Sequence, residues 1–331
     1  MVFQGPEEIG HERRGSYDDP FVHRNRVRAV SCLLSILGMA ALAAGCGRAN
    51  PRASERSGPE IGRDAKLTSG TTTSDPAAPA TLTSPGDSRE LLEPLASSSG
   101  APVERIDVGD GQHAFVALPI GARDKRALVV GIHGAGDRPD WSCTEWQAVT
   151  AGWAIVVCPV GVQHPTDKTA YVWGSAESIA SRADKAVRAV RARYGAWVDD
   201  GPLVYGGWSQ GGALASQVIA ARPGMFDRAV LVEVGHTPLD ANQVAAGLVA
   251  GGVRRAVVSC SSWKCRSFAS AFEGAAKRRS LPFRVNDVGL RGHWFDEPVF
   301  RTLGPAFVWM VEDERRYAGL GAAVDARYST D

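Results

Sequence analysis

The stretch LVYGGWSQGGALASQVIA, residues 203–220, puts a serine between glycines where an apolar strand should give way to a helix. Residues 202–207 have the pattern of a buried strand, and residues 212–224 that of a helix closed by a Pro-Gly pair. A tight strand-to-helix turn strains the serine backbone and exposes its hydroxyl. The bare spacing is a weak signal in a chain with 37 glycines, so the flanking strand and helix carry the prediction that Ser209 is a nucleophile.

Short apolar segments alternate with amphipathic ones on both sides of this turn. Continuous apolar runs that end in glycine or cysteine are typical of parallel strands buried on both faces. Ser175 is expected to cap an amphipathic helix between two of these runs. The pattern predicts an α/β fold with three layers and a mostly parallel sheet. We expect its strands, besides the one before the turn, at residues 127–134, 154–161, 229–235, 254–260 and 282–289.

Acyl transfer by a serine also needs a base and two N–H donors for the oxyanion. One donor is the N–H of Gln210, directly after the serine, and the glycine-rich turn at residues 133–137 is expected to supply the other. His293 follows the last strand, where the order serine, acid, histidine puts the base. His236 is the alternative base, and His133 is expected to be structural.

HGAGD at 133–137, GWSQGGA at 207–213 and GHW at 292–294 together resemble the α/β-hydrolase superfamily. They are most similar to its phospholipase/carboxylesterase branch, which includes acyl-protein thioesterases and dienelactone hydrolase-like enzymes. The resemblance covers about residues 102–310. It implies Ser209 as nucleophile, His293 as base, and the N–H groups of Ala135 and Gln210 as the oxyanion hole. It also implies hydrolysis of esters or thioesters without a cofactor.

The acid of the triad departs from this pattern. The family normally carries it in the loop after the seventh strand, which here is residues 259–265 and contains no Asp or Glu. The acid orients the histidine and stabilises its imidazolium form. Glu233, near the end of the strand at 229–235, is the first candidate, and the alternatives are Asp240, Asp296 and Asp287.

The N-terminal region has the features of an exported chain. Three arginines precede an apolar run at residues 29–44, and small residues lead to Cys46, so residues 1–46 resemble an export signal with a lipobox. We expect Cys46 to be lipidated; a secreted protein or an uncleaved anchor are the alternatives. Residues 47–101, rich in Ser, Thr, Pro and Ala, are expected to form a disordered tether. The hydrolase domain is then 102–316 and the C-terminal tail 317–331.

The composition and the cysteines indicate which partners, disulfides and metals to expect. The net charge is +1 and no basic stripe carries interleaved aromatics, so we expect no nucleic-acid partner and a membrane contact only through the lipid anchor. We expect Cys143 to pair with Cys158 and Cys260 with Cys265, because each pair would close a local loop; four buried thiols are the alternative. No His or Cys cluster has metal-ligand spacing, so no metal is expected.

The leading hypothesis is an exported serine esterase. The chain between Ser209 and His293 has no long insertion, so we expect no large lid over the site. This favours a small or extended, accessible acyl substrate. One alternative is a non-catalytic lipoprotein that binds a cell-envelope ligand. Another is a serine peptidase or acyltransferase. Tryptophans near the expected strand ends would line a cleft or pack in the core: Trp141, Trp146, Trp173, Trp208, Trp263 and Trp294.

Overall fold

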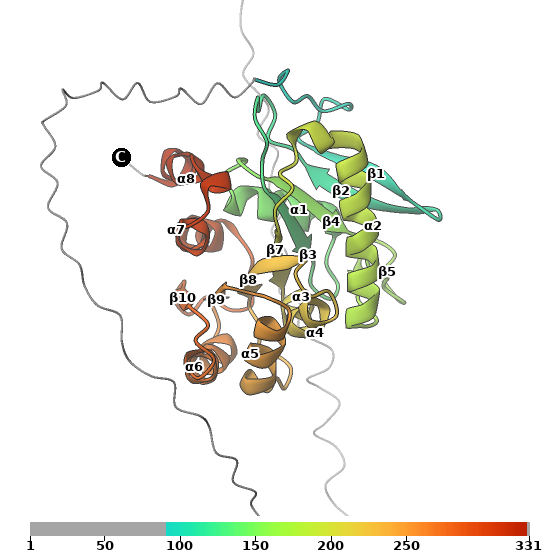
Figure 1. The fold of residues 1–331 in the computed structure, drawn as a ribbon. Coiled ribbons are helices and arrows are strands. Elements are labelled where there is room, and N and C mark those ends of the chain that lie inside the picture. Colours follow the sequence, from blue (N-terminus) through green and yellow to red (C-terminus); the bar gives the residue numbers. More distant parts are fainter. Residues whose placement is uncertain (1–90, 330–331) are drawn as a thin grey trace, which may run out of the picture. The chain divides into compact units, whose positions relative to one another are not determined.

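Apolar segments form the centre of an eight-stranded sheet in the computed structural model, which describes residues 91–329 (Figure 1). Every residue of the strands β3 (Leu128–Ile132), β4 (Ile155–Pro159) and β8 (Phe226–Val232) is buried. Strands covered on both faces are apolar along most of their length rather than alternating apolar and polar residues, and the exceptions in β8 are the buried Asp227 and Arg228. The predicted α/β architecture is therefore confirmed, with helices on both faces of the sheet.

The sheet is parallel except at one edge. Its order is β1-β2-β4-β3-β7-β8-β9-β10, and only β1 and β2 run antiparallel to their neighbours. A separate two-stranded hairpin lies outside this sheet. The remaining strands are β1 (Val103–Gly109), β2 (Gln112–Ala117), β7 (Leu203–Trp208), β9 (Arg255–Cys260), β10 (Phe283–Asp287) and, in the hairpin, β5 (Val162–Gln163) and β6 (Tyr171–Val172).

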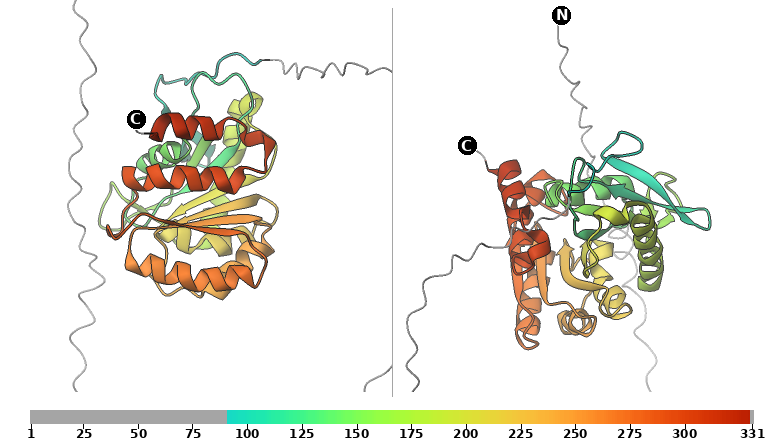
Figure 2. Two further views of the ribbon diagram at one scale, coloured as in Figure 1. Left: turned by 90° about the vertical axis from the view of Figure 1, so that its left-hand side faces the viewer. Right: turned by 45° about the horizontal axis from the view of Figure 1, so that its top comes forward.

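Two apolar clusters lie on opposite faces of the sheet. One contains buried residues of α2, α4, α5 and α6, and the other contains buried residues of α1, α7 and α8. Figure 2 shows α7 and α8 as neighbouring red helices at the C-terminal end of the chain. The helices are α1 (Pro139–Val149), α2 (Ala176–Tyr194), α3 (Gln210–Ala213), α4 (Ala215–Ala220), α5 (Ala241–Ala250), α6 (Trp263–Lys277), α7 (Glu297–Val311) and α8 (Leu320–Tyr328).

The indole of Trp146 on α1 packs over two paired glycines of the sheet. Gly131 of β3 and Gly206 of β7 are register partners, and a Cβ on either would lie 2.5 Å or 2.8 Å from the nearest atom of the Trp146 ring. Trp146 itself is fully buried. The two glycines therefore create the space that brings α1 against the sheet.

Several predicted boundaries differ from those observed. The strand expected at 229–235 is β8 and ends at Val232, because its pairing with β9 ends there, at Ser259. The helix after the serine turn is broken into α3 and α4 at Leu214. Ser175 does cap α2, where its side chain accepts a hydrogen bond from the N–H of Ser178.

Both ends of the folded region extend beyond the expected limits of 102 and 316. Leu95, in the expected tether, is 2% exposed, and its N–H donates to the carbonyl of Ala122. The expected tail contains α8, whose Leu320 and Val324 are buried in the cluster of α1 and α7. The predicted export signal, Cys46 and the tether before residue 91 lie outside the described residues.

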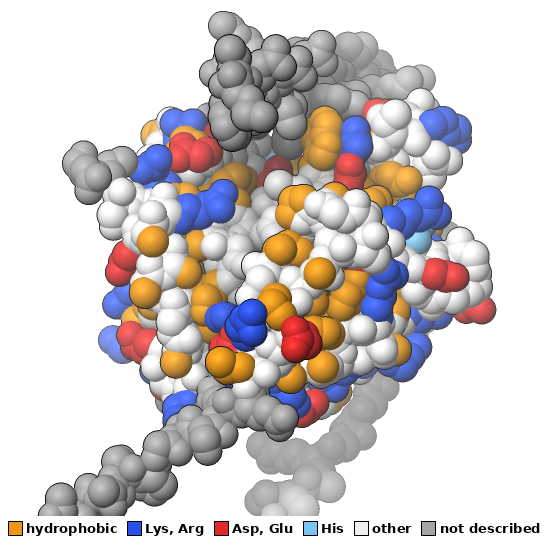
Figure 3. Space-filling model, turned by 90° about the horizontal axis from the view of Figure 1, so that it is seen from above, with side chains coloured by type: hydrophobic (Ala, Val, Ile, Leu, Met, Phe, Trp, Pro, Cys, Tyr) orange, Lys and Arg blue, Asp and Glu red, His pale blue; other side chains and the backbone are white. Residues whose placement is uncertain are grey.

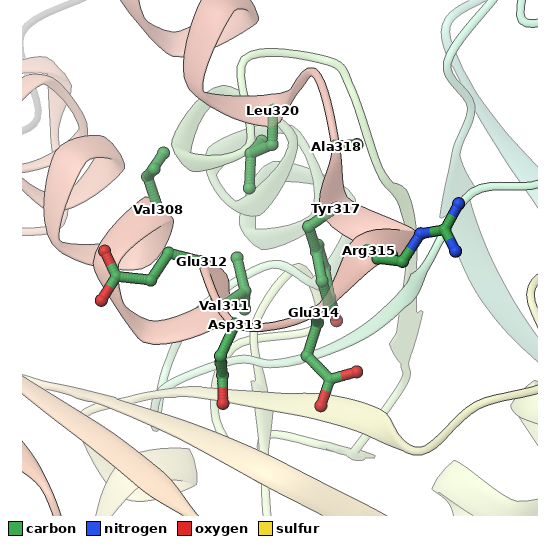
Figure 4. Close-up of a pocket in the computed structure, with 9 residues that line it drawn as sticks. All are labelled: Val308, Val311, Glu312, Asp313, Glu314, Arg315, Tyr317, Ala318 and Leu320. Atoms are coloured by element: carbon green, nitrogen blue, oxygen red, sulfur yellow. The ribbon is translucent and has the colours of Figure 1, made fainter. Parts of the chain in front are cut away.

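The C-terminal segment is joined to the sheet by a buried arginine. Arg228 on β8 is fully buried, and it donates hydrogen bonds to the carboxylates of Asp227 and Asp313 and to the carbonyl of Met310. A cavity of about 190 Å³ lies beside this network, between the end of α7 and the start of α8 (Figure 4). None of the residues predicted for the catalytic site lines this cavity.

The structure brings both predicted cysteine pairs to disulfide distance. The Cα atoms are 5.5 Å apart in Cys143–Cys158 and 5.3 Å apart in Cys260–Cys265. The first pair joins α1 to β4. The second closes the turn between β9 and α6.

The surface carries both signs of charge between apolar side chains. On the face in Figure 3, Lys and Arg alternate with Asp and Glu and do not gather in one stripe. In the part of the chain from 91 to 329, no helix combines the length and hydrophobicity of a membrane-spanning segment.

The glycines beneath Trp146 give a test of this packing. We expect Gly206→Ala to lower the free energy of unfolding by about 1–3 kcal/mol, because the new methyl group would overlap the indole. Gly195→Ala is the matched control, since a Cβ there meets no atom within 4 Å and the backbone φ is −55°. Chemical denaturation of both variants measures the difference. Equal stability of the two variants would contradict this account of the packing.

Candidate active site

Ser209 lies in a strained turn between β7 and α3. Its φ of 51° and ψ of −111° fall where non-glycine residues are rarely found. A Cβ on Gly207 would lie 2.7 Å from the backbone of Gly211, and one on Gly211 would lie 2.6 Å from Ile132 of β3. The two flanking glycines are therefore required for the reason expected from the sequence, and the turn has the backbone geometry of a nucleophile elbow.

His293 faces this serine from the loop between β10 and α7. Its Nε2 is 2.9 Å from Oγ of Ser209, which is hydrogen-bonding distance. The imidazole stacks on the indole of Trp208, with ring centroids 5.6 Å apart and planes 26° apart. Stacking holds the ring in one orientation while 33% of the side chain stays exposed to solvent.

Glu233 lies behind the histidine, directly after β8. Its carboxylate Oε2 is 3.4 Å from Nδ1 of His293, and the residue is 1% exposed. Catalytic hydrogen bonds are often long in a ligand-free site and shorten when substrate binds. Glu233 also has a positive φ of 51°, which turns the chain sharply as it leaves the strand. The structure thus brings together Ser209, His293 and the first of the four candidate acids.

The loop after β9, which lacks an acid of its own, holds the carboxylate of Glu233 in place. Oε1 accepts hydrogen bonds from the N–H and the hydroxyl of Ser261 and from the N–H of Ser262. Burial alone would raise the pKa of Glu233, but the nearby His236 and His293 side chains, together with these bonds from Ser261 and Ser262, hold that pKa far below its usual range. The carboxylate is therefore ionised at neutral pH.

The three alternative acids have other partners. Asp240 caps α5 by accepting from the N–H groups of Asn242 and Gln243. Asp287 pairs with Arg266, and Asp296 pairs with Arg291. In the described residues, none of the three lies within hydrogen-bonding distance of His293.

The two predicted oxyanion donors lie on loops that meet beside Ser209. A Cβ on Gly134 would be 3.2 Å from Cβ of Ser209, so the turn that carries Ala135 passes directly against the nucleophile. Among the hydrogen bonds found between residues 91 and 329, none uses the N–H of Ala135 or of Gln210. Both donors thus remain available to a substrate oxygen.

The side chain of Gln210 forms hydrogen bonds with the backbone of Trp173, directly after the hairpin. Its Oε1 accepts from the N–H of Trp173 at 2.9 Å, and its Nε2 donates to the Trp173 carbonyl at 3.0 Å. The indole N–H of Trp173 in turn donates to the carbonyl of His133. These bonds connect the two loops that supply the oxyanion donors.

His133 is buried, and both of its ring nitrogens form hydrogen bonds with backbone groups. Nδ1 donates to the carbonyl of Gly134, Nε2 accepts from the N–H of Gly161, and the ring stacks on Trp173 at 4.5 Å. Burial lowers the pKa of His133 to about 4. It is therefore a neutral structural residue, as expected.

His236, the alternative base, contacts the acid and not the nucleophile. Its Nε2 is 3.1 Å from Oε2 of Glu233 and 3.0 Å from Oγ of Ser262. Its ring meets that of His293 edge to face, with centroids 4.0 Å apart. The sequence analysis did not predict that a second histidine would contact the Glu233 carboxylate. The only indication in the sequence is that His236 lies three positions after Glu233.

The tryptophans divide between core and rim. Trp146 and Trp173 are buried, and Trp208 stacks on His293. Trp263 is 67% exposed and follows the loop that holds Glu233. Trp141 is 42% exposed, and Trp294 is half-buried. Only some of the six are therefore available to contact a ligand.

No family model and no curated protein matches the chain. Solved structures similar to it include an uncharacterised protein from Bacillus cereus, with 16% identity over 64% of this chain and a TM-score of 0.47; the match spans 65% of that protein. A putative dienelactone hydrolase from Klebsiella pneumoniae is 15% identical over 63% of this chain and 98% of its own, with a TM-score of 0.46. A carboxylesterase from Mesorhizobium loti is 16% identical over 63% and 99%, with a TM-score of 0.44.

The neutral state of His133 makes stability depend on pH. The unfolded chain binds a proton on this ring near pH 6.5, whereas the folded chain does so only near pH 4. Lowering the pH through this window therefore favours unfolding, by about 2 kcal/mol between pH 7.5 and pH 5. We expect His133→Gln to lose this part of the pH dependence, as measured by urea denaturation at several pH values. An unchanged pH slope in the variant would show that folding does not lower the pKa of His133.

Proposed function

We propose that this protein is a serine hydrolase that cleaves a carboxylic ester or thioester through an acyl-enzyme on Ser209. The observation that carries the proposal is the chain of contacts from Oγ of Ser209 to Nε2 of His293, at 2.9 Å, and from Nδ1 to Oε2 of Glu233, at 3.4 Å. A nucleophile, a base and an orienting acid in this order are the geometric signature of the mechanism.

Each residue has a role that its position supports. With Nδ1–H directed at the ionised Glu233, Nε2 of His293 carries a lone pair and accepts the Ser209 proton as Oγ attacks the acyl carbon. The oxygen that gains negative charge is stabilised by the N–H groups of Ala135 and Gln210. His293 then protonates the leaving alcohol or thiol. Water, activated by the same histidine, hydrolyses the acyl-enzyme.

The position of the acid also separates this proposal from a non-catalytic binding protein. That alternative would be favoured if only backbone and Lys264 lay behind His293. Instead the buried carboxylate of Glu233 is there, held by the loop after β9. An ionised carboxylate aligned behind an imidazole supports catalysis more than ligand binding.

Exposed apolar side chains near the site favour an accessible acyl group as substrate. Trp263, directly after the loop that follows β9, and Leu290, in the loop of His293, are 67% and 69% exposed. We also propose that the enzyme acts in the cell envelope, because the sequence carries a signal-like segment ending at Cys46 and two cysteine pairs lie at disulfide distance.

Labelling with a fluorophosphonate probe tests the nucleophile. We expect the full-length protein to be labelled, Ser209→Ala not at all, and His293→Ala at least about 100 times more slowly, because the serine loses its base. Gel fluorescence and intact-protein mass spectrometry measure the label. A folded wild-type protein that takes up no label would rule out the serine hydrolase.

The identity of the acid is tested separately. We expect Glu233→Gln to lower kcat for an activated ester by about 100-fold to 10,000-fold, because the imidazolium loses its charged partner. Asp240→Asn is the matched control and should stay within about twofold, since Asn also caps a helix. Steady-state kinetics on both variants decide between the two residues. Full activity in Glu233→Gln would remove Glu233 from the mechanism.

A further inference from the structure

Three potential metal ligands converge at the back of the proposed triad. One ring nitrogen of His236, one of His293 and a carboxylate oxygen of Glu233 all lie within 4.8 Å of one another. They come from the loops after β8 and β10, and His236 and His293 are 57 positions apart in the sequence. Because of this separation, the sequence shows no metal-ligand spacing for the cluster.

The distances within this cluster are close to those between ligands of a tetrahedral zinc ion. Bonds of about 2.0–2.2 Å at tetrahedral angles put neighbouring ligand atoms about 3.3–3.5 Å apart. Oε2 of Glu233 is 3.1 Å from Nε2 of His236 and 3.4 Å from Nδ1 of His293. These two distances are the edges that the carboxylate oxygen shares with the two imidazoles.

The chemistry of the donor set also fits. Two imidazoles and one carboxylate suit Zn²⁺ and neighbouring transition metals better than Mg²⁺, which prefers oxygen ligands. Hydrogen bonds from Ser261 and Ser262 hold Oε1, which leaves Oε2 facing the two rings. The His236 and His293 side chains are 28% and 33% exposed, while Nδ1 of His293 is buried and has no hydrogen-bond partner among the described residues, so this nitrogen has a lone pair or a proton that no other group uses.

We propose that Glu233, His236 and His293 form a site for a zinc-type divalent cation, and that its occupation reversibly switches off Ser209. The inhibitory half of this proposal rests on the proposed hydrolase function, but the binding half does not.

Binding would inhibit because it changes the tautomer of the base. A metal on Nδ1 of His293 requires a lone pair there, so the single proton of the neutral ring moves to Nε2. Nε2–H then donates to Oγ of Ser209 and cannot accept its proton. The carboxylate of Glu233 is at the same time engaged by the metal rather than by the imidazole. No bond to the substrate changes, and removing the metal restores the original tautomer.

Direct binding tests the site without needing activity. Full-length Ser209→Ala, stripped with chelator, is titrated with Zn²⁺ by calorimetry, alone and with His236→Gln or His293→Gln added. We expect one Zn²⁺ ion whose affinity falls at least about tenfold with either added substitution. His164→Gln, which removes a histidine outside the cluster, should keep the affinity, and Mg²⁺ should not compete. Equal zinc affinity in all these variants would overturn the site.

The inhibitory effect is tested on the nucleophile itself. Zn²⁺ should slow fluorophosphonate labelling of the wild type over the concentration range of the binding curve, and excess chelator should restore it. In His236→Gln, and in His236→Asn as a second variant, half-inhibition should need at least about ten times more Zn²⁺, each relative to its own metal-free rate. Retained folding is checked by the melting temperature. Zinc binding that leaves the labelling rate of the wild type unchanged would refute the inhibition.

A protein that is never labelled would refute the hydrolase and not the metal site. In that case the calorimetric comparison between His236→Gln and its parent still decides whether the cluster binds zinc.

Discussion

The candidate site depends on the contacts that the carboxylate of Glu233 makes with its neighbours. This carboxylate is buried at the end of β8, and it accepts hydrogen bonds from the loop after β9 while facing the histidine after β10. An ion buried in this way is tolerated only when its oxygens are satisfied by donors. Three consecutive strand-end loops are thus positioned by one side chain. Losing the whole side chain, rather than its charge alone, would leave the buried N–H groups of Ser261 and Ser262 without their acceptor.

The parts of the site that could be predicted from the sequence are the local ones. The elbow at Ser209 is specified within a few residues by glycines that a side chain could not replace. His293 was found from the order of the segments alone. The acid was harder, because Glu233, Asp240, Asp287 and Asp296 all occupy plausible loops. Only the tertiary structure shows that three of them are engaged elsewhere.

The differences between the predicted and the observed structure share one physical origin, which is contact between segments that are distant in the sequence. The apolar pattern of 229–235 continues past Val232, but a parallel strand ends where its pairing with the neighbour ends. The small, alanine-rich helix α8 shows little amphipathic pattern, and it is stabilised by packing against α7. Leu95 gives no signal of its own, since its burial depends on the segment around Ala122. His236 meets Glu233 only because the chain turns sharply at a positive φ.

The fit of Trp146 over Gly131 and Gly206 has a consequence beyond stability. Helix α1 begins at Pro139, two residues after the turn that carries Ala135. With its indole seated over paired glycines on β3 and β7, α1 cannot slide along the sheet without a steric clash. Strand β7 leads directly into Ser209. The same contact therefore fixes α1, which follows the turn of Ala135, relative to the strand that leads into Ser209, so a core side chain with no access to solvent helps to align the proposed nucleophile with a proposed oxyanion donor.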